Sequence, residues 1–153
     1  MLLELKPIHD PIALAALYYD PYIARVGHDH RPASPIEHEA VRYVGTYADG
    51  TLVGAFMVIE SGFVELDVHA LLTRRALKQS REFGKMMIRT LFENKEIARL
   101  TTYIMEELVM AKNYCLKLGF KDEGFRRDAC MKDGQLIGLH IMGLTRNDWE
   151  CAK

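Results

Sequence analysis

Long apolar runs, paired cysteines and an excess of charge of either sign are all scarce in this sequence. No apolar run approaches the roughly 20 residues that cross a bilayer, so we expect no membrane partner. The three cysteines are odd in number and widely spaced, which favours reduced thiols in a cytoplasm over a disulfide framework. Twenty Lys and Arg against 21 Asp and Glu give a formal charge of -1, which argues against nucleic acid as the main partner.

Proline and glycine are present but unevenly distributed. All five prolines fall within the first 35 residues, whereas ten of the eleven glycines lie at or after Gly45. The length of 153 residues is that of one domain with a single core. We therefore expect a single domain over residues 1–153, with a variable N-terminal helical arm over 1–37 and a core over 38–149.

The first 37 residues predict a short strand, a helix and an irregular segment. Residues 2–8 favour a strand that Pro7 ends. Asp10 and Pro11 are typical of an N-cap and a first helical position, and Pro21 should stop the helix. Ile12 is expected on the apolar side of this helix. Residues 21–36, rich in proline and histidine, predict an irregular arm with one helical turn.

The remaining residues alternate between strand and helix patterns. A hairpin is expected around Asp49-Gly50, with a return strand over 52–60 and a third strand over 63–72. A helix over 80–94, a strand over 99–105 and a helix over 107–118 follow, and Gly119 should end that helix. Two strands over 120–131 and 135–144 close the pattern. This order predicts a mixed α+β fold with one βαβ step.

Two motifs near the C-terminus connect this order to a known family. They are Leu116-Lys117-Leu118-Gly119-Phe120 and Glu123-Gly124-Phe125-Arg126, preceded by a hairpin that returns through Leu52-Val53-Gly54. Together they resemble the GCN5-related N-acetyltransferase (GNAT) superfamily over residues 38–149. The resemblance implies a mixed, mostly antiparallel sheet of six or seven strands with helices on both faces. Asp10-Pro11-Ile12 and residues 23–29 are similar to divergent members encoded by tailed phages.

The resemblance implies acetyl-CoA as the co-substrate. Family members place its pyrophosphate on the start of the third helix, where free N–H groups and the helix dipole suit an anion, through the motif Gln/Arg-x-x-Gly-x-Gly/Ala. The matching segment runs from Gln79 to Gly84, and Glu82 replaces its first glycine. That carboxylate should repel a phosphate, although flanking basic residues could offset it. The expected cofactor-binding residues are Ala70, Leu71, Leu72, Gln79, Ser80, Arg81, Phe83, Gly84 and Lys85.

Acetylation of an amine needs a proton acceptor for the ammonium and a proton donor for the leaving thiolate. His69 and Glu65 lie on one face of the strand over 63–72, and either could be the base. The family uses a tyrosine of the fourth helix as the acid. Cys115 occupies that position and Tyr114 is adjacent, so both are candidates, while a buried packing role is the alternative for Cys115.

Three functions stay open at this point. The first is acyl-CoA-dependent N-acetyltransfer to an amine of a small molecule or protein. The second is a catalytically degenerate GNAT-like scaffold or assembly protein, such as a phage virion-assembly protein in a host cytoplasm, because Glu82 and Cys115 depart from the family pattern. The third is a CoA-binding module without turnover. We expect no metal site at His28-Asp29-His30, and an exposed sheet edge would suit a homodimer.

Overall fold

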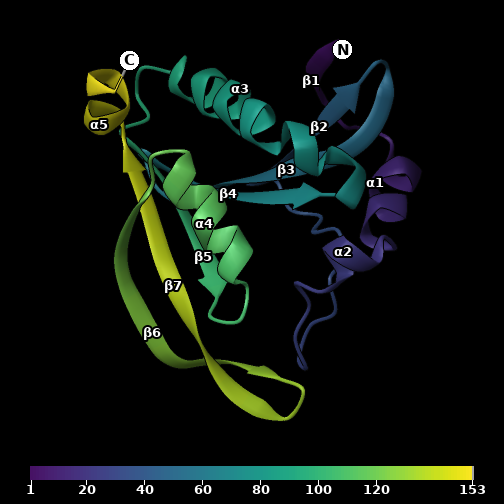
Figure 1. The fold of residues 1–153 in the computed structure, drawn as a ribbon, viewed down its shortest axis with the longest axis vertical. Coiled ribbons are helices and arrows are strands. Elements are labelled where there is room, and N and C mark those ends of the chain that lie inside the picture. Colours follow the sequence, from purple (N-terminus) through teal and green to yellow (C-terminus); the bar gives the residue numbers. More distant parts are fainter. Residues whose placement is uncertain (153) are drawn as a thin grey trace.

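In the computed structural model, which describes residues 1–152, the chain is organised around one seven-stranded sheet (Figure 1). The strand order is β1-β2-β3-β4-β5-β7-β6, and only β4 and β5 run parallel. The strands are β1 (Leu3–Pro7), β2 (Val41–Ala48), β3 (Thr51–Glu60), β4 (Glu65–Leu72), β5 (Arg99–Met105), β6 (Lys121–Lys132) and β7 (Gln135–Thr145). The helices are α1 (Pro11–Tyr18), α2 (Pro21–Ala24), the 3₁₀ helix η1 (Arg74–Gln79), α3 (Ser80–Phe92), α4 (Val109–Lys117) and α5 (Arg146–Cys151).

Helices cover both faces of the sheet. One buried cluster joins α3 and α4 to the sheet and contains Phe83 and Leu72. A second cluster joins α1 and α2 to the opposite face and contains Tyr18 and Leu71. Neighbouring residues of β4 thus belong to different clusters, as the alternation of side chains along a strand requires. The mixed sheet with helices on both faces is confirmed.

The predicted helix signals near the N-terminus are present, with two differences. Asp10 caps α1 by accepting the N–H of Ile12 at 2.9 Å, and Pro11 is the first helical residue. Ile12 was expected on the apolar side but is 79% exposed, because α1 turns Leu14, Leu17 and Tyr18 to the sheet instead. Pro21 begins α2 as well as ending the segment before it, since Asp20 supplies a second N-cap.

Two helical segments were not predicted. A 3₁₀ helix, η1, lies between β4 and α3 where the sequence indicated only a basic loop. The short helix α5 follows β7 because Thr145 caps it through the N–H of Asp148, at 3.1 Å. Trp149 of α5 stacks on Phe92, with ring centroids 4.9 Å apart. Strand β4 starts at Glu65, two residues later than expected, and Phe63 is fully exposed before it.

Candidate functional site

The candidate site lies where the parallel strands β4 and β5 separate. Their ladder contains three residue pairs, from Glu65 with Arg99 to Asp67 with Thr101. Beyond Asp67, β4 continues to Leu72 but pairs only with β3. One edge of its backbone therefore faces β5 without a ladder partner. This gap is the sheet feature that an extended ligand could fill by adding main-chain hydrogen bonds.

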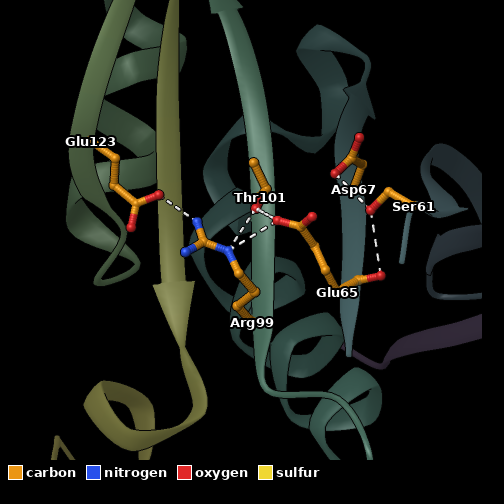
Figure 2. Close-up of polar contacts among 6 residues, drawn as sticks. All are labelled: Ser61, Glu65, Asp67, Arg99, Thr101 and Glu123. Carbon is orange, nitrogen blue, oxygen red and sulfur yellow. Dashed lines mark hydrogen bonds and ion pairs between the residues drawn. The ribbon is translucent and has the colours of Figure 1, made fainter. Parts of the chain in front are cut away.

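A network of charged side chains fixes the paired end of these strands (Figure 2). Arg99 Nε lies 3.0 Å from Glu65 Oε2, and the other end of the guanidinium binds Glu123 on β6. Thr101 Oγ1 donates to Glu65 Oε2 at 2.6 Å and accepts from Arg99 Nε at 3.0 Å. The network joins β4, β5 and β6. It explains why the strands stay together here and separate only further along.

Glu65 belongs to this closed end of the gap. Its carboxylate is already engaged by Arg99 and Thr101, four residues along the strand from His69. Asp67 lies between them and accepts a hydrogen bond from Ser61 at 3.0 Å. Burial raises the pKa of Asp67, and the negative charge of Glu65 adds to that rise. The structure therefore separates the two base candidates: Glu65 is at the closed end and His69 is at the open end.

His69 faces a cavity of about 410 Å³ at the open end of the gap. Its Nδ1 lies 3.4 Å from Thr102 Oγ1 of β5. Burial lowers the pKa of His69 to about 4, because the imidazolium ion would lose its hydration and gain no counter-charge. The side chain is consequently neutral at physiological pH and keeps a nitrogen lone pair that can accept a proton or a hydrogen bond.

The two candidate acids on α4 have different surroundings. Tyr114 donates its hydroxyl hydrogen to the backbone oxygen of Ser80, at 2.7 Å, and so ties α4 to the start of α3. Burial raises the pKa of Tyr114. Cys115 is a buried free thiol that lines the cavity, and burial raises its pKa to about 12. Both groups are protonated at neutral pH.

Gly84 allows this contact between the helices. A Cβ at position 84 would lie 2.6 Å from both the Tyr114 hydroxyl oxygen and Leu118 Cδ1. The glycine of the motif thus faces α4, and its absent side chain leaves room for Tyr114 to reach Ser80. Phe83, next to it, points into the main core and is fully buried.

A second cavity, of about 590 Å³, adjoins the first at the start of α3. The two share Ala70, Leu71 and Tyr114 in their walls. The basic residues that line it are Arg25, Lys78, Arg81 and Lys117. Ser80, a candidate for the phosphate, and Leu72, a candidate for the pantetheine arm, also line it. The cavity has the charge and the helix start that suit a pyrophosphate.

The remaining motif residues contribute less to this basic cavity. Gln79 caps α3 without a side-chain hydrogen bond. Glu82 lines the cavity, but its carboxylate is solvent-exposed and lies 3.7 Å from the ammonium of Lys85. Arg25 and Lys117 were missed in the sequence, because Arg25 is the C-cap of α2 and Lys117 is the last residue of α4, and no local pattern connects them to the motif.

The N-terminal arm closes the other side of the first cavity. Its Asp29 accepts the backbone N–H groups of Asp133 and Gly134, both at 2.8 Å, in the turn between β6 and β7. The Asp29 N–H donates to the Met131 oxygen at 3.0 Å. We call these three hydrogen bonds the Asp29 latch. The latch holds residues 28–34 of the arm beside the cavity.

The arm histidines are engaged in local turns. His28 Nδ1 accepts the N–H of His30 at 3.3 Å, and His38 Nδ1 accepts the N–H of Ala40 at 3.0 Å. Within residues 1–152, no three His, Cys, Asp or Glu side chains are grouped as metal ligands would be. In the same range, no helix is long and apolar enough to cross a membrane.

The separated strands, the βαβ step and the helices on both faces define the fold of the GNAT acetyltransferases. A spermidine N-acetyltransferase from Vibrio cholerae in complex with CoA and spermine aligns with a TM-score of 0.80 and 14% identity, over 97% of this chain and 98% of that one. A point mutant of the Vibrio cholerae enzyme SpeG aligns with a TM-score of 0.81 and 13% identity, over 99% of this chain and 98% of that one. A proposed acetyltransferase from Acinetobacter baylyi aligns with a TM-score of 0.78 and 17% identity, over 95% of this chain and 94% of that one.

The sequence itself places the chain in a family. The profile of the family described as "Protein of unknown function (DUF2824)" matches residues 27–152, and the chain belongs to that family. No curated protein matches the chain in sequence.

Proposed function

We propose that the chain is an acyl-CoA-dependent N-acetyltransferase of the GNAT superfamily that acts on an amine of a small molecule or protein. The observation that carries the proposal is the unpaired edge of β4, which borders a cavity that adjoins the basic cavity at the start of α3. A structural neighbour with the same fold is in complex with CoA. The described residues support candidate positions for the pantetheine arm and the pyrophosphate of such a ligand.

The backbone edge at Ala70 to Leu72 would hold the extended pantetheine arm by strand-like pairing. The first N–H groups of α3, at Ser80 and Arg81, would hold the pyrophosphate. Lys78 and Arg25 would neutralise its charge from neighbouring elements. When bound, acetyl-CoA supplies the thioester that an amine nitrogen attacks.

We assign the base to His69, because it is neutral and lies at the open end of the gap. It would align the free amine by accepting a hydrogen bond, and its pKa of about 4 makes it only a weak acceptor for the proton of the ammonium form. Glu65 shares its strand face, but its carboxylate is occupied by Arg99 and Thr101. Tyr114 and Cys115 are the proton donors of α4 that line this cavity. Because the hydroxyl hydrogen of Tyr114 is committed to Ser80, its donation would require that contact to open.

A scaffold without turnover, such as a virion-assembly protein of a phage, is the second candidate. Two observations favour it: Glu82 brings a carboxylate to the basic cavity, and the pKa of Cys115 is raised to about 12, far above that of a useful acid near neutrality. β1 and β6 are the edge strands of the sheet and could serve a homodimer or another partner. The free cysteines support a cytoplasmic site of action for either function.

The test combines cofactor binding with turnover. Acetyl-CoA at millimolar concentration should raise the melting temperature, because a ligand that binds only the folded state stabilises it. Lys78→Gln with Arg81→Gln should remove the rise, whereas the exposed Lys95→Gln should not. The absence of any rise in the parent protein would refute cofactor binding and leave the scaffold. A rise without thiol release against a panel of amines would indicate a CoA-binding module.

A further inference from the structure

The cavity at the β4–β5 gap has an apolar wall and no carboxylate. Most of its lining residues are aliphatic or aromatic, and they include Met57, Val68, Ile104 and Leu139. The ionisable residues in the wall are His28, Arg31, His69, Tyr18, Tyr103, Tyr114, Cys115 and Cys130. None of these is an acid that is charged at neutral pH. A polycationic amine would therefore lose its hydration here without gaining a single counter-charge.

Arg31 is the one guanidinium among the residues described in this wall. Within residues 1–152 its side chain makes neither an ion pair nor a hydrogen bond, although ten ion pairs occur elsewhere. The pKa of Tyr18 is raised by burial and by its hydrogen bond to Tyr43, and the positive charge of Arg31 opposes that rise. The guanidinium is thus close to a buried phenol of the same cavity.

The backbone holds Arg31 in place from two directions. His28 and Arg31 exchange both backbone hydrogen bonds, at 3.0 and 3.1 Å, which closes a tight turn. Asp29, which lies between them in that turn, is bound to the β6–β7 turn by the Asp29 latch. Asp29 keeps its charge, but within residues 1–152 it forms no ion pair with Arg31, and the side chains that act on its pKa are His28 and His30. Arg31 is therefore presented at the cavity with its charge available.

We propose that this cavity takes an amine with an apolar body and a carboxylate, as in a hydrophobic α-amino acid, and that Arg31 binds the carboxylate. The inference rests on the proposed function for the role of the amine, but the binding of the carboxylate does not need the cofactor. Planar guanidinium groups suit carboxylates because two parallel N–H groups match the two oxygens. The apolar wall would hold the side chain, and the amine would lie toward His69.

This assignment separates the chain from its structural neighbours. The Vibrio cholerae enzyme is described with spermine, a polycation. The wall of the present cavity contains the guanidinium of Arg31 and no carboxylate, so this cavity should favour an anionic group over a polycation. The substrate class is therefore expected to differ although the fold is shared.

The experiment compares acids with their amides. L-methionine, L-leucine and L-phenylalanine, their carboxamides, and spermidine are titrated into the full chain without cofactor, with binding followed by calorimetry or ligand-observed NMR. The same compounds are then tested for thiol release with acetyl-CoA. We expect at least one acid to bind roughly tenfold more tightly than its amide, the factor typical of one charge-assisted hydrogen bond.

Two variants identify the residue responsible. Arg31→Gln should bring the acid-to-amide ratio close to one, while Arg89→Gln, an exposed arginine of α3 outside both cavities, should leave it unchanged. Preference for spermidine, equal binding of acids and amides, no binding of any acid, or an unchanged ratio in Arg31→Gln would each overturn the proposal. Acid binding without thiol release would support the site and count against the transferase function alone.

Discussion

The depressed pKa of His69 predicts a specific loss of stability in mild acid. The ordinary pKa of histidine is 6.5, and burial lowers that of His69 to about 4. Between these values the unfolded chain binds a proton that the folded chain does not. The contribution of His69 to the free energy of unfolding should therefore be fully present above pH 6.5 and decrease as the pH drops toward 4. Below pH 4 it should not change further.

The size of the effect follows from the shift. One pKa unit corresponds to 1.36 kcal/mol, so the full shift amounts to at most about 3 kcal/mol, and the part expressed between pH 6.5 and 5 to about 2 kcal/mol. In a domain whose stability lies in the usual range of about 5–15 kcal/mol, this is a substantial fraction. His69→Gln removes the ionisable group and should remove this portion of the pH dependence.

The measurement is urea unfolding at pH 7.5, 6, 5 and 4.5, followed by the fluorescence of Trp149. Carboxylates titrate in both proteins, so the informative quantity is the difference between the parent and His69→Gln at each pH. That difference should change by about 2 kcal/mol in favour of the variant between pH 7 and 5. His9→Gln, at an exposed histidine, is the matched control and should follow the parent. Parallel curves for the parent and His69→Gln would show that this imidazole is not buried as described.

Three further predictions concern the cofactor site and the arm. Glu82→Gln should tighten acetyl-CoA binding roughly two- to fivefold at low salt, because it removes an anion from the first turn of α3, where the carboxylate lies near the ammonium of Lys85. Unchanged or weaker affinity by calorimetry would mean that no phosphate binds there. Gly84→Ala should destabilise the chain by about 1–3 kcal/mol and weaken cofactor binding, because the added Cβ would displace the Tyr114 hydroxyl from Ser80. A denaturation curve identical to that of the parent would count against this packing role. Asp29→Ala should speed amide exchange at Asp133 and Gly134 and lower the affinity for acceptor acids. In the parent, the N–H groups of these two residues lower the pKa of Asp29, so the Asp29 latch should persist through the ordinary carboxyl range near pH 4 and open only at lower pH. Opening of the latch above that range, followed by NMR during acidification, would contradict this prediction.

The fold could be predicted because its signals are local. Asp10-Pro11, Asp49-Gly50 and Gly119 mark their turns and caps through backbone preferences, and the structure gives Asp49, Gly50 and Gly119 the positive φ angles that these signals require. The alternation along β4 likewise determined which residues share a face. The helix η1 was missed because its residues have no apolar period, and its one buried member, Ala76, is too small to mark a face.

The site was only half predictable, for a different reason. The motif segment identified Ser80 and Arg81 because they are consecutive at a helix start. Arg25 and Arg31 come from an arm whose position depends on Asp29 reaching a turn more than a hundred residues further along the chain. No periodicity in the sequence encodes such a contact. The sequence also could not predict that Glu65 and His69 lie at opposite ends of the gap, because this depends on where Arg99 joins β4 and β5.

The three-pair ladder between β4 and β5 has a mechanical consequence. Residues 3–72 and residues 99–145 each form continuous antiparallel sheets, and few backbone hydrogen bonds join the two halves across the middle. The β4–β5 boundary, which borders the cavity, is thus the boundary with the fewest ladder pairs in the sheet, and the Arg99 network lies at its paired end. A ligand that widens the gap at its open end therefore breaks fewer ladder pairs than it would between any other two neighbouring strands, although both halves still share one buried core.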